Sequence, residues 1–275
     1  MKPRRFAVIG DPVGHSKSPA MHRAAYRALG LPHDYEALRV TAAELPRVVE
    51  DLREGRYDGL NVTVPHKRAA LALSDAAADP TLTAANTLVR AGDGRVVAHN
   101  TDVPALAEEL RLLAGPGASW SSRRALVLGS GGAALAAVAA LRSLGSTDVV
   151  VRARTARAQA TQPWQPSPAS EARTLAVVQA TSAGMAGADP GDAVAQVVAW
   201  DALPDDAVAL DVVYAPPETP FLVAAGARGL GRANGLGMLA RQGALAFELW
   251  LGVPAPLEVM RAALETGTGD VKRLS

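Results

Sequence analysis

The sequence predicts an α/β protein of two domains. Short apolar runs alternate with longer stretches rich in Ala and Leu along most of the chain, which is typical of strand–helix units that build a parallel sheet. The 275 residues exceed the roughly 150 that are usual for one domain. Because 49% of the residues are hydrophobic and 20% are charged, we expect a sizeable buried core and not a disordered chain.

The first hundred residues are expected to alternate between strands and helices. A Ser-Pro pair at Ser18 marks a helix start, and Ala-Gly-Asp-Gly between two apolar runs marks a β-hairpin. Strands are expected at residues 5–9, 34–38, 59–64, 86–90 and 95–98. Helices are expected at residues 18–29 and 42–53, with a third that begins after Pro65.

A second series of strand–helix units begins near residue 103. Strands are expected at residues 125–128, 148–151, 175–179 and 207–213, and helices at 103–113, 238–249 and 256–265. The longest uncharged run, residues 125–141, is broken by glycines and is shorter than the ~20 apolar residues that span a membrane. We therefore expect no membrane segment, no signal peptide and a cytoplasmic protein.

Charge and cysteine content exclude several classes of partner. The 28 Lys and Arg residues nearly balance the 27 Asp and Glu residues, so the net charge of +1 lacks the basic excess of a nucleic-acid-binding protein. The absence of Cys excludes disulfides and Cys-ligated zinc. His15 and His22 have no third ligand near them in the sequence, so we expect no metal and a small molecule as the partner.

A glycine-rich turn points to a nucleotide. Gly129, Ser130, Gly131, Gly132 and Ala133 follow an apolar strand and open a helix, which matches the G-x-G-x-x-G/A turn of Rossmann-type domains. In that turn the backbone approaches a pyrophosphate at the helix N-terminus. The alternative is a glycine-rich turn without a ligand.

The end of the next strand indicates which dinucleotide binds. An NAD site is expected to have a carboxylate there for the ribose, but this segment carries Arg152, Arg154, Thr155 and Arg157. Guanidinium groups and a hydroxyl suit a 2′-phosphate, so we expect NADP(H) as the cofactor. The alternative is a solvated basic loop.

A proton donor must accompany hydride chemistry, and two side chains at strand ends are candidates. Lys67 and Asp102 each follow an apolar strand, and together they could exchange protons with a substrate hydroxyl. The alternatives are a surface Lys and a capping Asp. Ser16 and Ser18 lie between a strand and a helix start, where hydroxyls and N–H groups suit an anion, although Ser18 could instead cap the helix.

Several short motifs follow one another along nearly the whole chain. They span residues 10–19 (GDPVGHSKSP), 61–67 (NVTVPHK), 85–87 (ANT), 100–102 (NTD), 129–133 (GSGGA), 180–185 (ATSAGM), 211–214 (DVVY) and 234–242 (NGLGMLARQ). In these motifs the chain resembles the shikimate dehydrogenase family. The resemblance implies reversible, NADPH-dependent reduction of 3-dehydroshikimate to shikimate on the route to aromatic amino acids (chorismate biosynthesis). It also implies an α/β substrate-binding domain of residues 1–103 and 236–275 and a Rossmann-type NADP-binding domain of residues 104–235.

The resemblance also implies a role for each matching residue. Lys67 and Asp102 would be the catalytic pair. The substrate would be bound by Ser16, Ser18, Thr63, Asn86, Tyr214 and Gln242. NADP(H) would be bound by Gly129, Ser130, Gly131, Gly132, Ala133, Arg154, Thr155, Arg157, Thr181, Met185, Val213, Gly235 and Met238.

The chain departs from the family pattern mainly in its cofactor half. Ala153 stands where Asn usually precedes Arg-Thr, Gln179 stands where Asn usually precedes Ala-Thr-Ser, and residues 157–181 form a shorter segment than usual. In addition, Val103, Pro104 and Ala105 follow Asp102 in a segment where a Gly is usual, which bears on the entry to the next helix. We expect a mild effect from Gln179 and a less regular contact with the 2′-phosphate.

Two alternatives stay open at this point. One is a quinate/shikimate or aminoshikimate dehydrogenase that uses NAD, because the same side chains can bind a related cyclohexane acid. The other is a non-catalytic NADPH-binding regulator, against which the presence of both Lys67 and Asp102 argues. The protein is expected to be a monomer or a homodimer.

Overall fold

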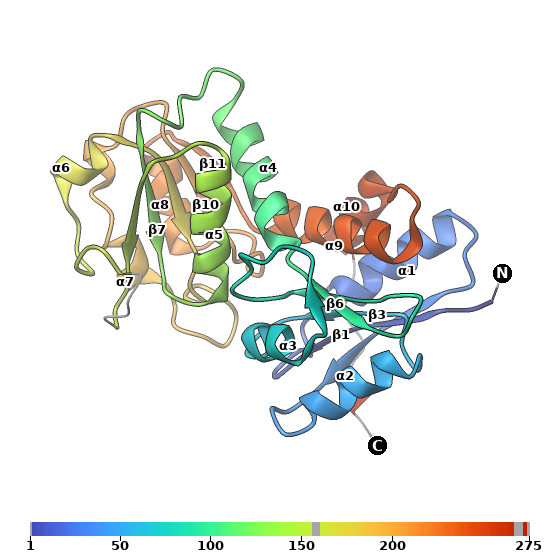
Figure 1. The fold of residues 1–275 in the computed structure, drawn as a ribbon. Coiled ribbons are helices and arrows are strands. Elements are labelled where there is room, and N and C mark those ends of the chain that lie inside the picture. Colours follow the sequence, from blue (N-terminus) through green and yellow to red (C-terminus); the bar gives the residue numbers. More distant parts are fainter. Residues whose placement is uncertain (1, 156–159, 267–271, 274–275) are drawn as a thin grey trace. The chain divides into compact units, whose positions relative to one another are not determined.

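The chain forms two compact units, each with a β-sheet between helices (Figure 1). The computed structural model describes residues 2–155, 160–266 and 272–273. Unit 1 comprises Met1–Thr101 and Leu239–Ser275, and unit 2 comprises Asp102–Met238. The predicted fold class, α/β with two domains, is confirmed.

Unit 1 is built on a sheet with the strand order β12-β2-β1-β3-β5-β6-β4. Its strands are β1 (Arg5–Gly10), β2 (Asp34–Arg39), β3 (Gly59–Val62), β4 (Ala76–Ala77), β5 (Thr87–Arg90), β6 (Val96–His99) and β12 (Lys272–Arg273). Its helices are α1 (Ser18–Ala28), α2 (Leu45–Arg53), α3 (Lys67–Leu73), most of α9 (Leu236–Leu251) and α10 (Leu257–Thr266). The strands β12, β2, β1 and β3 are parallel, whereas β5 is antiparallel to both β3 and β6.

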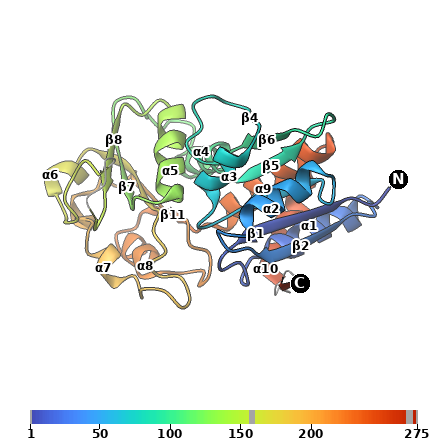
Figure 2. The same cartoon turned by 60° about the horizontal axis from the view of Figure 1, so that its bottom comes forward.

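Helices cover both faces of the unit 1 sheet. Figures 1 and 2 show α2 and α3 on one face and α1, α9 and α10 on the other. Strand residues alternate between the faces, so Ala7 and Ile9 join the core under α2, whereas Phe6 stacks on Trp250 of α9 at 4.9 Å between ring centroids. The Trp250 indole N–H donates to the carbonyl of Leu88 at 3.1 Å and fixes α9 on the sheet.

Unit 2 is a doubly wound parallel sheet of order β11-β10-β9-β7-β8. Its strands are β7 (Arg124–Leu128), β8 (Asp148–Arg152), β9 (Thr174–Gln179), β10 (Val208–Asp211) and β11 (Gly231–Ala233). Its helices are α4 (Asp102–Ala114), α5 (Gly132–Ser143), α6 (Pro168–Glu171), α7 (Asp192–Ala195) and α8 (Pro220–Ala227), with a short 3-10 helix at Trp200–Ala202. The strand order reverses beside β7, and ligands of open α/β sheets bind at such a switch point.

Two apolar cores fill the two sides of this sheet. Ala125 and Val127 of β7 pack with α4 and α5, whereas Leu126 and Leu128 pack with the segments of α7 and α8. The strand β7 is therefore apolar on both faces, as expected for a central parallel strand. This explains the uninterrupted apolar run ahead of the glycine-rich turn.

Most expected elements are present, and the differences have local causes. The expected helix at 42–53 begins at Leu45, because the Glu44 carboxylate accepts the N–H and the hydroxyl of Thr41 and forms a turn there. The expected strand at 207–213 ends at Asp211, whose carboxylate accepts the N–H of Val213. The helix α8 was not expected, because its sequence is apolar all round and lies among prolines.

Arg152 is buried in unit 2 and holds the sheet to its shorter helices. Its guanidinium forms two hydrogen bonds to the Glu171 carboxylate, at 2.8 and 3.0 Å, and both side chains are fully buried. It also donates to the Gln162 side chain and to the carbonyl of Val197. The expectation that Arg152 contributes a guanidinium to the 2′-phosphate site is therefore wrong, because its side chain points into the core.

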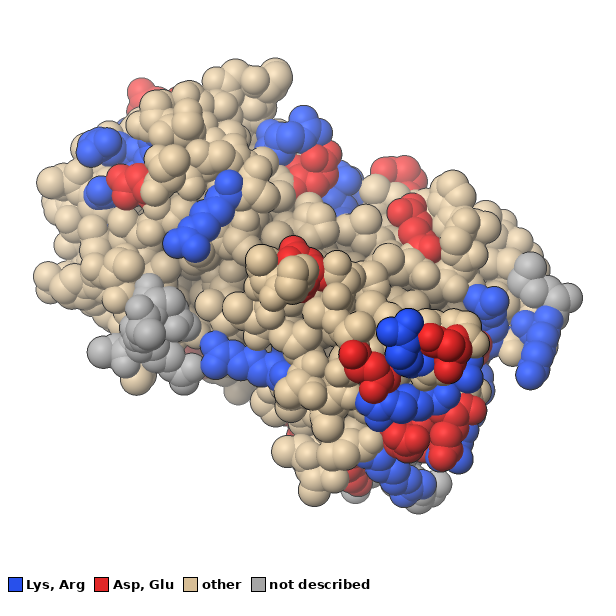
Figure 3. Space-filling model, viewed as in Figure 1, with Lys and Arg blue, Asp and Glu red and all other residues tan. Residues whose placement is uncertain are grey.

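Charges of both signs mix on the surface of unit 1. Figure 3 shows Lys and Arg beside Asp and Glu over the part of the unit that holds α2 and the β5–β6 hairpin. There Arg53 pairs with Glu50 and Asp75, and Arg95 pairs with Asp93. Among the described residues, no helix is both long enough and apolar enough to cross a membrane.

We expect Glu171→Gln to lower the free energy of unfolding by about 3–5 kcal/mol, because it leaves the Arg152 charge buried without its counter-ion. Glu108→Gln, which breaks the exposed pair with Arg111, is the matched control and should cost less than about 1 kcal/mol. Chemical denaturation of both variants measures the difference. Similar costs for the two variants would contradict the structural role of Arg152.

The same pair predicts a pH dependence. Burial acts to raise the pKa of Glu171, but hydrogen bonds from Arg152 and from the N–H groups of Ala199 and Ser167 outweigh it and hold the pKa below its usual range. A lowered pKa in the folded state contributes stability above the usual Glu value of ~4.3, and this contribution is lost as the pH falls through the lowered pKa. The difference between wild type and Glu171→Gln should therefore shrink below about pH 4.

Candidate active site

Ser16 and Ser18 lie where β1 leads into α1. The Ser16 hydroxyl accepts the N–H of Ser18 at 3.3 Å, and the Ser18 side chain interacts with the phenol of Tyr35 in β2. Lys17 occupies the N-cap position, and no side chain caps the helix. The alternative interpretation of Ser18 as a helix cap is therefore wrong.

Thr63 and Lys67 follow β3. The N–H of Thr63 donates to the carbonyl of Ile9 at 2.9 Å, so the chain stays paired with β1 beyond the end of β3. Lys67 begins α3, and its carbonyl accepts the N–H of Ala85 at 2.9 Å. This backbone bond places Lys67 beside the segment that carries Asn86.

The Asn86 side chain forms hydrogen bonds to two distant segments of unit 1. Its side-chain oxygen accepts the N–H of Thr101 at 2.7 Å, and its side-chain nitrogen donates to the Thr101 hydroxyl at 3.0 Å and to Gln242 Oε1 at 3.5 Å. The Asn86 side chain is buried, so these bonds fix its orientation. Three predicted site residues, Lys67, Asn86 and Gln242, are thus brought together within unit 1.

A buried polar chain supports these residues from behind. The Tyr35 hydroxyl donates to Asn61 Oδ1 at 2.7 Å, and Asn61 Nδ2 donates to the Thr87 hydroxyl at 3.0 Å and to the carbonyl of Asn86 at 3.3 Å. Burial holds the pKa of Tyr35 well above its usual range, so its phenol stays a proton donor. Sequence reasoning quoted Asn61 and Thr87 in motifs but gave neither a role.

Asp102 is the first residue of α4 and follows Thr101 directly. Both the N–H and the hydroxyl of Thr101 bond Asn86, so the residue that precedes Asp102 is fixed beside the start of β5. A carboxylate in the first turn of a helix is also favoured by the helix dipole. Helix stabilisation and proton transfer are compatible roles for Asp102.

The glycine-rich turn of unit 2 fits a pyrophosphate. Gly129 has φ +126°, and a Cβ there would lie 2.9 Å from the carbonyl oxygen of Ala180, so only Gly suits this position. Gly131 is the N-cap of α5, and a Cβ there would meet no heavy atom within 4 Å. No side chain caps α5, so its first N–H groups are left for another acceptor. The space beside them is open, and the side chain of any other residue at position 131 would partly fill it. Ser130, Gly132 and Ala133 complete the turn.

Arg154 and Thr155 follow β8, and both are exposed. The Arg154 guanidinium donates to the Asp189 carboxylate at 3.0 Å. Arg157, the third residue expected at the 2′-phosphate, lies outside the described residues. Among the described residues of this segment, Arg154 therefore has an exposed guanidinium, whereas that of Arg152 is buried. The pairing of Arg154 with an acidic group was not expected.

The remaining cofactor candidates lie in two turns after β9 and β10. The Thr181 hydroxyl accepts the N–H of Ala183, and the Gln179 amide bonds both the N–H of Thr181 and the carbonyl of Ala183. Gln179 therefore supports this turn with both ends of its side chain. Met185 lies in the same segment and is exposed.

The turn after β10 is held by a buried carboxylate. Burial raises the pKa of Asp211 to about 6, although the Thr219 hydroxyl, at 2.6 Å, and the N–H of Val213, at 2.9 Å, both donate to it. The carbonyl of Val213 accepts the N–H of Gly235 at 3.1 Å. Tyr214 follows Val213, and burial raises the pKa of its phenol. Met238 packs against the core beside α4 and α5.

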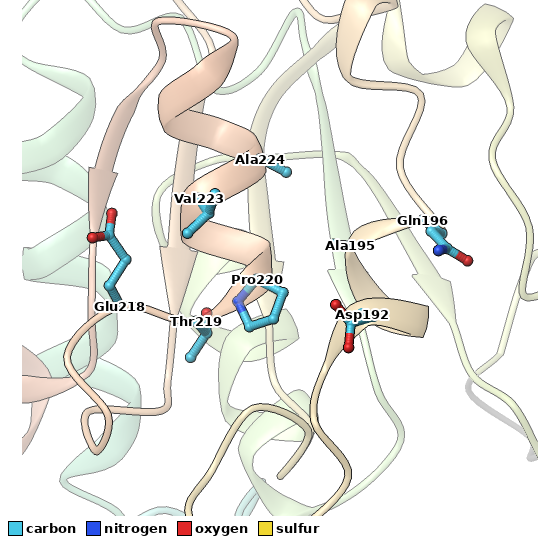
Figure 4. A pocket seen from close by; sticks show the side chains of 8 residues that line it. All are labelled: Asp192, Ala195, Gln196, Glu218, Thr219, Pro220, Val223 and Ala224. Carbon is cyan, nitrogen blue, oxygen red and sulfur yellow. The ribbon is translucent and has the colours of Figure 1, made fainter.

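An open hollow on unit 2 is a separate feature. It lies between α7 and α8 and is lined by Asp192, Ala195, Gln196, Glu218, Thr219, Pro220, Val223 and Ala224 (Figure 4). None of these is a predicted site residue. The hollow therefore adds nothing to the candidate site.

Sequence reasoning missed Tyr35, Asp189 and Asp211 as supports of the candidate site. Tyr35 lies in an apolar strand, where an aromatic residue is usually a core residue. Asp189 is 35 positions from its partner Arg154, so no local pattern joins them. Asp211 stands in a quoted motif and follows an apolar run, which was the signal for a buried acid at a strand end.

Family models match both ends of the chain. The shikimate dehydrogenase substrate binding domain matches residues 8–88, and the shikimate 5'-dehydrogenase C-terminal domain matches residues 235–265. A shikimate dehydrogenase (NADP(+)) of Methylobacterium radiotolerans is 42% identical, over 92% of this chain and 93% of that protein.

Solved structures give the same picture at the level of the fold. Shikimate 5-dehydrogenase from Thermus thermophilus, in complex with NADP(H) and shikimate, is 37% identical with a TM-score of 0.81, over 95% of this chain and 98% of that chain. The ligand-free 5-ketofructose reductase of a Gluconobacter strain is 28% identical with a TM-score of 0.82, over 96% of this chain and 99% of that chain. The identity to the Methylobacterium relative and its coverage decide between these families: this chain belongs to the shikimate dehydrogenase family.

Proposed function

We propose that this protein is an NADP-dependent shikimate dehydrogenase that reduces 3-dehydroshikimate to shikimate and catalyses the reverse reaction. The observation that carries the proposal is the cluster in unit 1 that joins Asn86, Thr101 and Gln242 beside Lys67. The names and bound ligands of the relatives support the same substrate and cofactor.

The substrate-binding side is assigned to unit 1. Ser16 and Ser18 would bind the carboxylate of shikimate, because two hydroxyls at a helix start suit an anion. Thr63, Asn86 and Gln242 would bind its ring hydroxyls, with Tyr214 of unit 2 as a further hydroxyl donor. The buried polar chain behind Asn86 would keep the amide in one orientation during binding.

Lys67 and Asp102 would handle the proton. When bound, NADPH supplies the hydride. An ammonium at Lys67 would donate a proton to the carbonyl oxygen of 3-dehydroshikimate as it becomes a hydroxyl, and the amine would accept that proton in the reverse direction. Asp102 would stabilise the charged Lys67 and accept a hydrogen bond from the adjacent ring hydroxyl.

The cofactor side is assigned to unit 2. The residues from Gly129 to Ala133 would hold the pyrophosphate, and Arg154 and Thr155 the 2′-phosphate, with Arg157 as a further candidate. The residues Thr181, Met185, Val213, Gly235 and Met238 would line the nicotinamide. The open space at Gly131 and the uncapped start of α5 support this assignment.

The test of the function is an absorbance assay at the nicotinamide band, with shikimate or quinate as substrate and NADP or NAD as cofactor. We expect the highest kcat/KM for shikimate with NADP. Preference for quinate with NAD would favour the quinate/shikimate alternative. Binding of NADP without turnover of any of these acids would favour the non-catalytic regulator.

We expect Lys67→Ala to lower kcat by about 10²- to 10⁴-fold with little change in KM for shikimate, which is the usual effect of losing one positioned acid–base group. Asp102→Asn should have a similar or slightly smaller effect. Steady-state kinetics measure both variants, and an unchanged unfolding midpoint shows that the fold is intact. A kcat close to wild type would remove Lys67 from the mechanism.

Arg154 should set the choice of cofactor. We expect at least a tenfold preference for NADP in kcat/KM, since one charge-assisted hydrogen bond to the 2′-phosphate supplies the ~1.4 kcal/mol that this ratio requires. Arg154→Ala should remove most of the preference and leave the kcat/KM for NAD unchanged. Arg228→Ala, which also removes an Arg from a surface pair with an Asp, is the matched control. A preference that survives Arg154→Ala would assign the 2′-phosphate to other residues.

A further inference from the structure

Asp189 is the partner of the one described guanidinium assigned to the 2′-phosphate. Its Oδ2 accepts the hydrogen bond from Arg154 at 3.0 Å, and its Oδ1 accepts the N–H of Gly191 at 2.9 Å. The backbone carbonyl of Asp189 also accepts the N–H of Gly184 at 2.7 Å. The carboxylate is therefore held in place by its own loop, independently of Arg154.

The side chains of Arg154 and Asp189 differ in how firmly they are held. Arg154 has a long side chain that is 58% exposed, whereas the Asp189 carboxylate is fixed by the Gly191 N–H and is 36% exposed. An exposed ion pair of this kind is weak, so the Arg154 guanidinium can leave Asp189 and bind a dianionic phosphate. The Asp189 carboxylate, which its own loop holds in place, then loses its partner, so binding of the phosphate includes the cost of breaking this pair.

We propose that Asp189 is a specificity-determining residue that competes with the 2′-phosphate of NADP for Arg154 and so lowers the preference of the enzyme for NADP over NAD. This inference rests on the proposed function, because it assumes that Arg154 binds the 2′-phosphate. NAD lacks the 2′-phosphate for which Asp189 would compete. Asp189 should therefore affect NADP and leave NAD unchanged.

The variant Asp189→Asn isolates the charge. Asn has the same shape, and its amide oxygen can still accept the N–H of Gly191, so the loop is kept while the competition for Arg154 is removed. We expect the Kd of NADP to fall about three- to tenfold and the Kd of NAD to stay within about twofold. The gain should shrink at high salt, because the interaction is between exposed charges.

Titration calorimetry of the enzyme with NADP and with NAD, without substrate, measures these constants apart from turnover. Asp205→Asn is the matched control, because it neutralises an exposed carboxylate that pairs with another Arg of unit 2, Arg228, and should change neither Kd. In an Arg154→Ala background most of the gain from Asp189→Asn should disappear, since the guanidinium that is competed for is gone.

Several outcomes would overturn the inference. An unchanged Kd for NADP in Asp189→Asn would show that the carboxylate does not compete. A raised Kd for NADP would show that Asp189 holds Arg154 ready for the phosphate. A gain of equal size for NADP and NAD, or one that persists in Arg154→Ala, would separate Asp189 from the 2′-phosphate. If wild type binds neither nucleotide, the proposed function itself fails, which the same titration reveals.

Discussion

The amide of Asn86 is the constraint on which the candidate substrate side of unit 1 depends. Its backbone and side chain together bond the ends of β3 and β6, the Thr101 backbone that precedes α4, and Gln242 of α9. A buried amide has to satisfy donor and acceptor groups at the same time, so it tolerates one orientation only. Asn61 and Thr87 complete this pattern from the sheet side. Residues that are far apart in the sequence are therefore held together by the Asn86 side chain. Any other orientation of its amide would leave buried donors or acceptors without hydrogen bonds.

Unit 2 separates two arginines that look equivalent in the sequence. Arg152 and Arg154 are two positions apart, yet the first is fully buried against Glu171 and the second is exposed beside Asp189. A buried guanidinium is stable only with a full set of acceptors, and Glu171, Gln162 and Val197 supply that set. Arg152 thus stabilises the core of unit 2, whereas Arg154 lies at the surface. The strand β8 ends at Arg152, and Arg154 lies in the exposed segment that follows it.

Much of the architecture could be predicted from local patterns, because apolar periodicity and turn residues act over short distances. The strand, glycine turn and helix around Gly129 are an example, and so is the β5–β6 hairpin. Contacts between distant segments could not be predicted in this way. Nothing near Arg152 in the sequence reveals Glu171, and nothing near Ser18 reveals that its side chain leaves the helix uncapped and interacts with Tyr35. The places of Lys67 and Asp102 at strand ends suggested an acid–base pair, whereas the roles of the nicotinamide residues came from the family resemblance alone, and all these roles are proposals.

The discontinuous make-up of unit 1 has a consequence for synthesis on the ribosome. Phe6, Tyr26 and Tyr35 lie on the sheet face and the helix that Phe247 and Trp250 of α9 cover, so this apolar surface faces water until α9 emerges. Unit 2 is continuous from Asp102 to Met238 and can bury its own core earlier. Nascent chains should thus be most vulnerable to aggregation, and most dependent on chaperones, while α9 is still in the exit tunnel. The helix that brings Gln242 to Asn86 also closes this face, so unit 1 gains its apolar cover and its candidate binding side at the same moment.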